Sequence, residues 1–192
     1  MLRYVRESHE RLHWKTAEAG ASMGTTLVVA WLLRGTFSWV NVGDSRLYRY
    51  RDDTLELLTL DHTRNEFARR DGRPEVAPEL DHLSQNFIFG SRGLGDNASL
   101  RLEPGLDSGT EPLEPGDVLL LCSDGVWDFV DSERIADILQ RNAEPQVATD
   151  TLVQAAMNAG SNDNLTALVV LVMEQKPPEF SWTDDFDVLR TL

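Results

Sequence analysis

The chain has 192 residues, 41% of them hydrophobic, which is enough apolar surface for one domain with a buried core but too little for two large domains. Its 32 acidic and 18 basic side chains give a formal net charge of −14, so we expect neither nucleic acid nor a membrane surface as partner. The single cysteine, Cys122, excludes an intrachain disulfide framework, and no apolar run is long enough to cross a bilayer, so we expect a soluble, cytoplasmic protein.

The first half of the chain predicts a helix followed by a β-meander. A helix is expected over residues 3–19, ended by Gly20. The pattern then alternates with period two, which predicts strands at residues 25–33, 36–42, 47–51 and 55–58. Short turns at residues 34–35, 43–46 and 52–53 separate them, so neighbouring strands are expected to pair antiparallel.

The second half predicts fewer strands and more helix. Residues 61–90 are polar and rich in turn formers, with one helical candidate at residues 64–70. A strand is expected at residues 118–122, a helix that starts at residues 131–133 and continues over 134–140, a second helix at 145–159, and a last strand at 165–173. Because strands and helices do not alternate, the order predicts an α+β fold with antiparallel sheets, comprising one domain at residues 1–173 and an acidic tail at 174–192.

Four aspartates lie at the ends of predicted strands. Asp44, Asp61 and Asp124 each follow a strand, and Asp163 comes shortly before one. A half-buried carboxylate is costly unless it is paired or bound to a metal, and several at one end of a sheet would raise each other's pKa. Oxygen ligands without cysteine or histidine clusters favour Mg²⁺ or Mn²⁺ over Zn²⁺. Taken singly, each of these acids is better explained as a turn residue, and spacing alone does not bring them together.

Five segments, read in order, resemble the metal-dependent protein phosphatase 2C (PPM) family of serine/threonine phosphatases, in particular its bacterial branch. They are GASMGTTLVVAWL, VNVGDSRLYRYRDDTLELLTLDHT, SRGLGD, LLLCSDGVWDFV and SNDNLTALVVLV, which together span residues 20–172. The resemblance implies two antiparallel sheets packed face to face as a β-sandwich, flanked by helices, with a metal centre at one end.

The resemblance also implies a chemistry. Two Mn²⁺ or Mg²⁺ ions, with a third in some members, hold a water that attacks the phosphate of a phosphoserine or phosphothreonine without a phosphoenzyme intermediate. By their places in the motifs, Asp124 and Asp163 are implied as direct metal ligands, and Asp128 and Asp61 as ligands of the additional, weaker ion. The alternative for Asp128 is an acid at a helix N-terminus, stabilised by the helix dipole.

Other residues of these motifs are expected to support the site. Asn164 and Gly125 belong to the two metal-ligand motifs, and we expect Asn164 to support its loop. The GDSR turn is expected to be architectural, with Asp44 and Arg46 able to pair. Trp127 is expected to pack against its surroundings.

The chain departs from the family pattern at its N-terminal side. Two family motifs have no counterpart, namely one with an arginine for the substrate phosphate and a DGxGG-type turn whose aspartate bridges the two metals. We therefore expect an N-terminally incomplete sandwich and an under-ligated metal site. Two functions stay open: a phosphatase acting on phosphoproteins made by a serine/threonine kinase, and a non-catalytic module, truncated or degenerate, that binds or regulates a partner.

Overall fold

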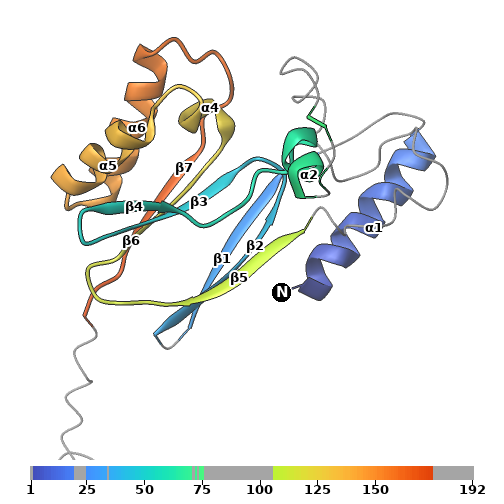
Figure 1. The fold of residues 1–192 in the computed structure, drawn as a ribbon, viewed down its shortest axis with the longest axis horizontal. Helices are drawn as coiled ribbons and strands as arrows, with labels where there is room; N and C mark the ends of the chain where they lie inside the picture. The colour runs from blue at the N-terminus through green and yellow to red at the C-terminus, as the bar shows by residue number, and fades with distance from the viewer. Residues whose placement is uncertain are drawn as a thin grey trace, which may run out of the picture.

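The computed structural model of the chain describes residues 2–19, 25–33, 35–70, 72, 74–75 and 106–174. Figure 1 shows the elements in space. In chain order they are α1 (Leu2–Ala19), β1 (Leu27–Leu33), β2 (Thr36–Val42), β3 (Arg46–Arg51), β4 (Thr54–Leu57), α2 (Arg64–Arg70), β5 (Asp107–Pro112), β6 (Val118–Cys122), α4 (Asp124–Trp127), α5 (Ser132–Arg141), α6 (Pro145–Asn158) and β7 (Ala167–Leu171). None of the helices in these ranges is both long and apolar enough to span a bilayer.

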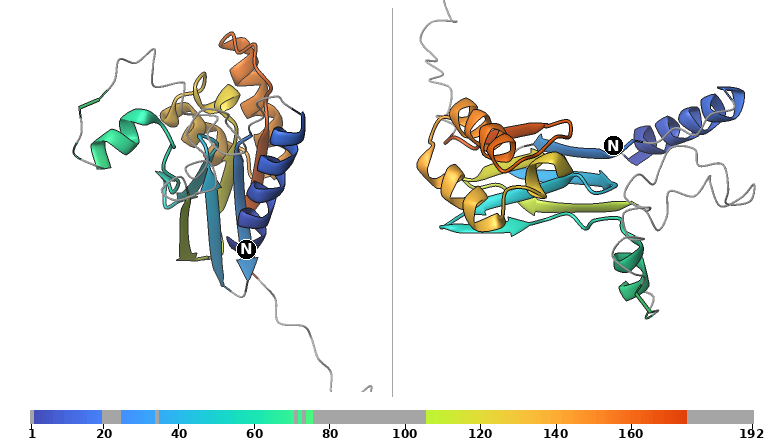
Figure 2. Two further views of the ribbon diagram at one scale, coloured as in Figure 1. Left: turned by 90° about the vertical axis from the view of Figure 1, so that its right-hand side faces the viewer. Right: turned by 90° about the horizontal axis from the view of Figure 1, so that it is seen from above.

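The strands form two antiparallel sheets. Sheet A has the order β1-β2-β5 and sheet B the order β4-β3-β6-β7. Figures 1 and 2 show α5 and α6 beside sheet B, while α1 lies at the far side of the molecule, next to sheet A. The predicted α+β fold with antiparallel sheets is therefore confirmed.

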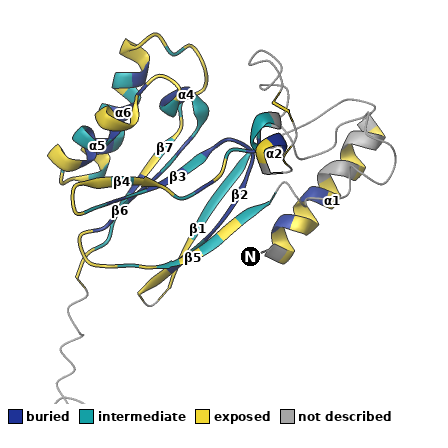
Figure 3. Cartoon of the chain, in the orientation of Figure 1, coloured by how far each residue is buried: buried dark blue, intermediate teal, exposed yellow. Residues whose placement is uncertain are grey.

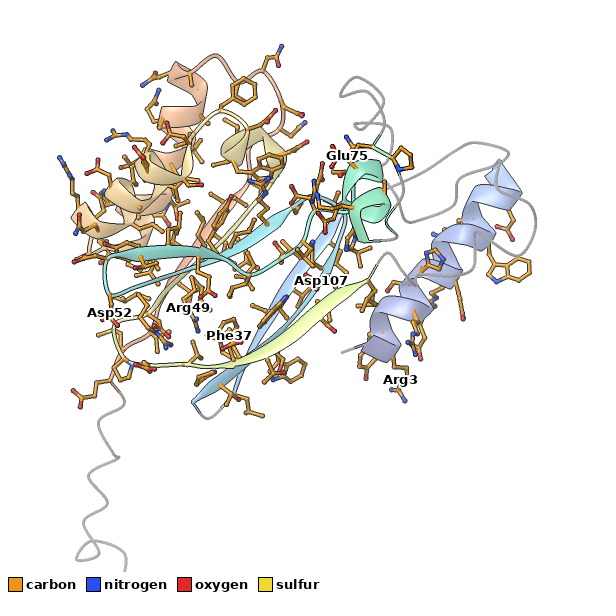
Figure 4. All side chains as sticks on the ribbon, in the orientation of Figure 1. Arg3, Phe37, Arg49, Asp52, Glu75 and Asp107 are labelled. Atoms are coloured by element: carbon orange, nitrogen blue, oxygen red, sulfur yellow. The ribbon has the colours of Figure 1, made fainter. Side chains whose placement is uncertain are left out.

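The core lies in two layers, one between the sheets and one under the helices. Phe37 and Leu119 are buried between the sheets, and Phe37 is labelled in Figure 4. The next residue along β6, Leu120, points the other way and packs with Ile135 of α5 and Leu152 of α6. Since successive strand residues face opposite sides, β6 is covered on both faces, which explains its uninterrupted apolar sequence. Figure 3 shows the buried residues gathered along these strands and helix faces.

Sheet A is covered differently at its two ends. Val5 of α1 packs against Val40 and Val42 of β2. At the other end of β1, Trp31 and Leu33 are exposed by 56% and 59%. Within the described part of the chain β1 pairs only with β2, so it forms an edge of sheet A.

Turn chemistry accounts for the hairpin between β3 and β4. Asp52 and Asp53 have φ of 47° and 58°, in the left-handed region, and Arg51 pairs with Thr54 across them. Two consecutive left-handed residues match the right-handed twist of the flanking strands, and aspartate is one of the few residues other than glycine that tolerates this conformation. The turn predicted at residues 52–53 is confirmed.

The end of β3 is anchored to the loop before β6 by a buried ion pair. Arg51 donates from Nε and Nη2 to both carboxylate oxygens of Asp117, each at 2.6 Å. Asp117 is 1% exposed and also accepts the backbone N–H of Glu114. Burial acts to raise the pKa of Asp117, but these hydrogen bonds outweigh it and hold the pKa below its ordinary value.

Several predicted boundaries need correction. Strand β5 was not predicted, and neither was the single helical turn α4. Strand β7 occupies residues 167–171 instead of 165–173, because residues 165–166 belong to the loop before it. The predicted loop region contains α2 at the expected residues 64–70. Residues 76–105, with the motif SRGLGD, and residues 175–192 of the predicted tail lie outside the described residues.

Candidate metal centre

The GDSR turn joins β2 to β3 and is held on one side by the segment that carries Asp61. Gly43 donates its N–H to Nδ1 of His62 at 2.9 Å, and the N–H of His62 donates to the carbonyl of Gly43 at 3.0 Å. Gly43 has φ of 110°, and a Cβ there would lie 2.5 Å from Cγ2 of Thr26. Both the conformation and the close approach require glycine at this position.

Asp44, the next residue, carries a buried carboxylate. It is 3% exposed, and its Oδ2 has no hydrogen-bond partner in the described part of the chain. Burial, and after it the negative charge of Asp124, raise the pKa of Asp44 to about 6, and Asp61 adds a smaller effect. Three predicted site acids from three different segments, Asp44, Asp61 and Asp124, therefore interact electrostatically.

Arg46 does not pair with Asp44, so the partner predicted from the sequence was wrong. Its Nε donates to Oδ1 of Asp61 at 3.0 Å and its Nη2 to Oδ2 at 2.6 Å. Its Nη1 donates to the hydroxyl of Tyr48 at 3.0 Å. Burial acts to lower the pKa of Arg46, but the bonds to Asp61 and Tyr48 outweigh it and raise the pKa. In this conformation both oxygens of Asp61, a predicted metal ligand, are engaged by an arginine.

The segments that carry Asp124 and Asp163 are attached to each other by two hydrogen bonds between Ser123 and Thr166. Ser123 donates its N–H to the carbonyl of Thr166 at 3.0 Å, and Thr166 returns its N–H to Oγ of Ser123 at 3.1 Å. A Cβ on Gly125 would lie 2.7 Å from the carbonyl oxygen of Asn164, so only glycine permits this contact. The predicted supporting residues Gly125 and Asn164 are thus in direct contact.

The four predicted ligands differ in their surroundings. Asp124 and Asp61 are partly buried, whereas Asp128 and Asp163 are exposed. Asp124 and Asp163 each accept the backbone N–H of the following residue, at 2.8 Å and 2.7 Å. Asp128 is the C-terminal cap of α4, while the N-cap of α5 is Asp131, so the alternative of a helix N-terminal acid at Asp128 is wrong.

The residues fit a hard cation that keeps part of its water shell. No three acidic, histidine or cysteine side chains within the described ranges lie close enough together to hold a metal ion by themselves. Mg²⁺, however, is usually bound through one or two carboxylates and several waters. The buried carboxylate of Asp44, with a free oxygen next to the charge of Asp124, is a donor set that a divalent cation would neutralise.

Two residues of this region have contacts that the sequence did not predict. Trp127 donates from Nε1 to the carbonyl of Asp44 at 3.0 Å, and its ring lies 3.4 Å from the guanidinium carbon of Arg46. Asp107, labelled in Figure 4, accepts the N–H of Leu60 and so attaches the start of β5 to the segment before Asp61. Trp127 could have been suspected, because it lies between two predicted site acids in the sequence SDGVWD.

Comparison with known proteins relates most of the chain to one family. Residues 3–165 match the family described as Protein phosphatase 2C. The chain is 33% identical over 148 residues to "Serine/threonine phosphatase stp" of Listeria welshimeri, covering 77% of this chain and 56% of that protein. It is 34% identical over 175 residues to "Protein phosphatase PhpP" of Streptococcus pneumoniae, covering 90% of this chain and 68% of that protein.

Solved structures give the same result. PppA, described as a key regulatory component of T6SS in Pseudomonas aeruginosa, superposes with a TM-score of 0.71 at 30% identity, covering 86% of this chain and 65% of that chain. The catalytic domain of the phosphatase PstP, in complex with 2 manganese ions, superposes with a TM-score of 0.70 at 28% identity, covering 88% and 68%. The chain thus spans between 56% and 68% of the length of these four proteins. The resemblance seen in the sequence is confirmed, and the chain belongs to the protein phosphatase 2C family.

Proposed function

We propose that this chain carries out, with bound Mn²⁺ or Mg²⁺, the hydrolysis of phosphoserine and phosphothreonine in proteins. Its family and the phosphatase names of its relatives support this function. The structural observation that carries the proposal is the buried carboxylate of Asp44, whose Oδ2 lacks a partner among the described residues and lies in the field of Asp124. Such a carboxylate is costly in a folded chain unless a cation is bound near it.

The roles proposed for the individual residues follow the family motifs. Asp124 and Asp163 would hold the catalytic ions, and Asp61 and Asp128 an additional one. A bound divalent ion supplies a water of lowered pKa and offsets the charge of the phosphoryl oxygens. The chain itself positions these ligands, because the two hydrogen bonds between Ser123 and Thr166 keep the loops of Asp124 and Asp163 side by side.

Arg46 affects how tightly the additional ion can bind at Asp61. Both oxygens of Asp61 accept a hydrogen bond from Arg46, so an ion at Asp61 would use the remaining lone pairs of these oxygens and lie close to the guanidinium charge. The additional site should therefore be weaker than the site at Asp124, since the positive charge of Arg46 repels a cation bound at Asp61.

An assay of the 192-residue chain on a phosphothreonine peptide tests the proposal. We expect turnover in Mn²⁺, none in EDTA, and a loss of at least 100-fold in Asp124→Asn. Asp150→Asn, at an exposed position of α6, is the matched control and should retain wild-type turnover. A folded wild-type chain that binds Mn²⁺ but turns over the peptide no faster than Asp124→Asn does would contradict the proposal.

The sequence-based predictions of partner and location belong to this proposal as well. The substrate would be a phosphoprotein modified by a serine/threonine kinase, with no role for nucleic acid or membrane, and the protein would be cytoplasmic. The phosphatase unit would comprise residues 1–173, with residues 174–192 as an acidic tail. The alternative of a non-catalytic binding or regulatory module finds no support in the comparisons.

A further inference from the structure

Trp127 makes two polar contacts that packing alone would not require. Its indole Nε1 donates to the backbone carbonyl of Asp44 at 3.0 Å. The face of its ring stacks on the guanidinium of Arg46, whose central carbon is 3.4 Å from the ring centroid. A cation placed over an indole face at this distance is attracted by the ring quadrupole. One side chain therefore contacts both charged residues of the GDSR turn.

The position of Trp127 in α4 connects this turn to Asp124. Helix α4 has four residues, with Asp124 at its start and Trp127 at its end. The N–H of Asp128 donates to the carbonyl of Asp124 at 3.0 Å, which closes one helical turn around both residues. A helix of one turn has little stability of its own, so contacts at its end determine where its first residue lies.

Arg46 extends the connection to Asp61. Its guanidinium lies over the indole face of Trp127 and forms two hydrogen bonds with the carboxylate of Asp61. The planar guanidinium suits both partners, since it can stack through its face while its edge donates two parallel hydrogen bonds. The three predicted site acids Asp44, Asp61 and Asp124 are thereby held through a single tryptophan and a single arginine.

We propose that Trp127 and Arg46 form a clasp that positions the acids of the metal centre, with Trp127 holding the turn of α4 that carries Asp124 against the GDSR turn that carries Asp44. This inference rests on the proposed function, because it concerns the geometry of the metal site. Trp127 is a positioning residue in this account: it contacts neither the ion nor the substrate, and it acts through Asp124 and Asp44.

The opposing interpretation is that Trp127 only fills space. It does pack against the core under α5 and α6, so truncation would destabilise the chain in either case. Trp127→Phe separates the two interpretations, because it retains an aromatic ring and removes the N–H donor to Asp44. Arg46→Lys is a second, independent variant that retains the charge and removes the planar group. Phe129→Leu is the matched control, since Phe129 is two residues away and 36% exposed.

The experiment measures Mn²⁺ affinity by titration calorimetry and backbone amide exchange in EDTA, both on the full chain. For Trp127→Phe and Arg46→Lys we expect the Kd of the tighter Mn²⁺ site, the one assigned to Asp124, to rise by 10-fold or more, as for other groups that orient metal ligands. The amides of Trp127 and Asp128, which bond to Ser123 and Asp124, should exchange at least five-fold faster, while amides of α6 keep their wild-type rates. Phe129→Leu should match the wild type in both measurements.

The outcomes separate this inference from the proposed function. If the wild-type chain binds no Mn²⁺, the proposed function fails and the positioning role fails with it. If the wild type binds Mn²⁺ and Trp127→Phe binds it within two-fold of the same Kd, only the clasp is overturned, even if exchange in α4 is faster. Unchanged exchange in α4 together with a raised Kd would also overturn it, because the effect would then not pass through the helix.

Discussion

The guanidinium of Arg46 donates to both carboxylate oxygens of Asp61, from Nε at 3.0 Å and from Nη2 at 2.6 Å, across 15 residues of sequence. Both side chains are about four-fifths buried, with exposed fractions of 19% and 20%. The pair therefore attaches the segment after β4 to the start of β3, at a place where Asp61 and Asp124 both act electrostatically on Asp44. Its disruption should be visible in stability as well as in metal binding.

Asp61→Ala leaves Arg46 with its charge largely buried and without its carboxylate partner. We expect the free energy of unfolding to fall by about 1–3 kcal/mol, below the cost of breaking a fully buried pair because both groups keep some contact with water. Urea unfolding in EDTA measures this loss. Glu10→Ala, on the exposed side of α1, is the control and should change stability by less than about 0.5 kcal/mol. Equal stability of the two variants would show that the ion pair contributes nothing.

The raised pKa of Asp44 should make the stability of the metal-free chain depend on pH. Its pKa is raised from the ordinary 3.8 to about 6 in the folded chain, so the folded state binds more protons than the unfolded state between these values. Stability should therefore fall as the pH rises from about 4 to about 6, by at most about 3 kcal/mol from this group. Asp44→Asn should flatten this part of the profile in EDTA. An unchanged slope in the variant, with Asp150→Asn as control, would contradict the assignment.

Substitution of Gly43 tests the close approach to Thr26 at the GDSR turn, and the same substitution at Gly116 is its control. Both have positive φ, 110° and 98°, but a Cβ on Gly43 would meet Thr26 at 2.5 Å, whereas a Cβ on Gly116 would meet nothing within 4 Å. Gly116→Ala should cost about 1 kcal/mol from backbone strain alone, and Gly43→Ala about 1–3 kcal/mol more from the clash. Thermal and urea unfolding of the two variants measure the difference. Equal losses would mean that Thr26 moves aside freely.

The ion pair between Asp117 and Arg51, which is remote from the candidate metal centre, should make the stability of the fold sensitive to acid. Because the pKa of Asp117 is lowered in the folded chain, its stabilising effect is complete above the ordinary value of 3.8 and is lost as the pH falls through the lowered value. Asp117→Asn should cost about 2–4 kcal/mol at neutral pH and leave the Kd for Mn²⁺ unchanged. The control is Glu56→Gln, which breaks the pair with Arg49 at a side chain that is 51% exposed and should cost less than about 1 kcal/mol. Equal losses in the two variants would rule out a special role for the buried pair.

Much of the fold could be predicted from local patterns. Strands β2 and β6 and helix α2 have the residues expected from the sequence, because their apolar runs or helical segments are bounded by turn residues. The start of α5 was also predicted correctly, since Asp131 is its N-cap and accepts the N–H of Arg134 at 2.8 Å. These elements depend on residues close together in the chain.

The candidate site was predictable in its residues but not in its contacts. The family motifs named Asp44, Asp61 and Asp124, yet the partner of Arg46 and the two contacts of Trp127 involve residues 15 to 83 positions apart. A salt bridge forms with whichever carboxylate the backbone brings within reach, and short-range spacing does not contain that information. The pairing expected between Asp44 and Arg46 was wrong for this reason.

The sequence by itself determined most of the strands and helices and the family to which the chain belongs, because hydrophobic periodicity and motif order can be read along the chain. Only the tertiary structure decided strand β5, whose sequence DSGTEP has no apolar alternation. It pairs with β2 through backbone hydrogen bonds, and Gly109 lies where a Cβ would come within 2.2 Å of the ring of Trp39. Backbone pairing and the absence of a side chain leave no hydrophobic signal in a sequence, so such a strand is found only when its neighbour is already in place.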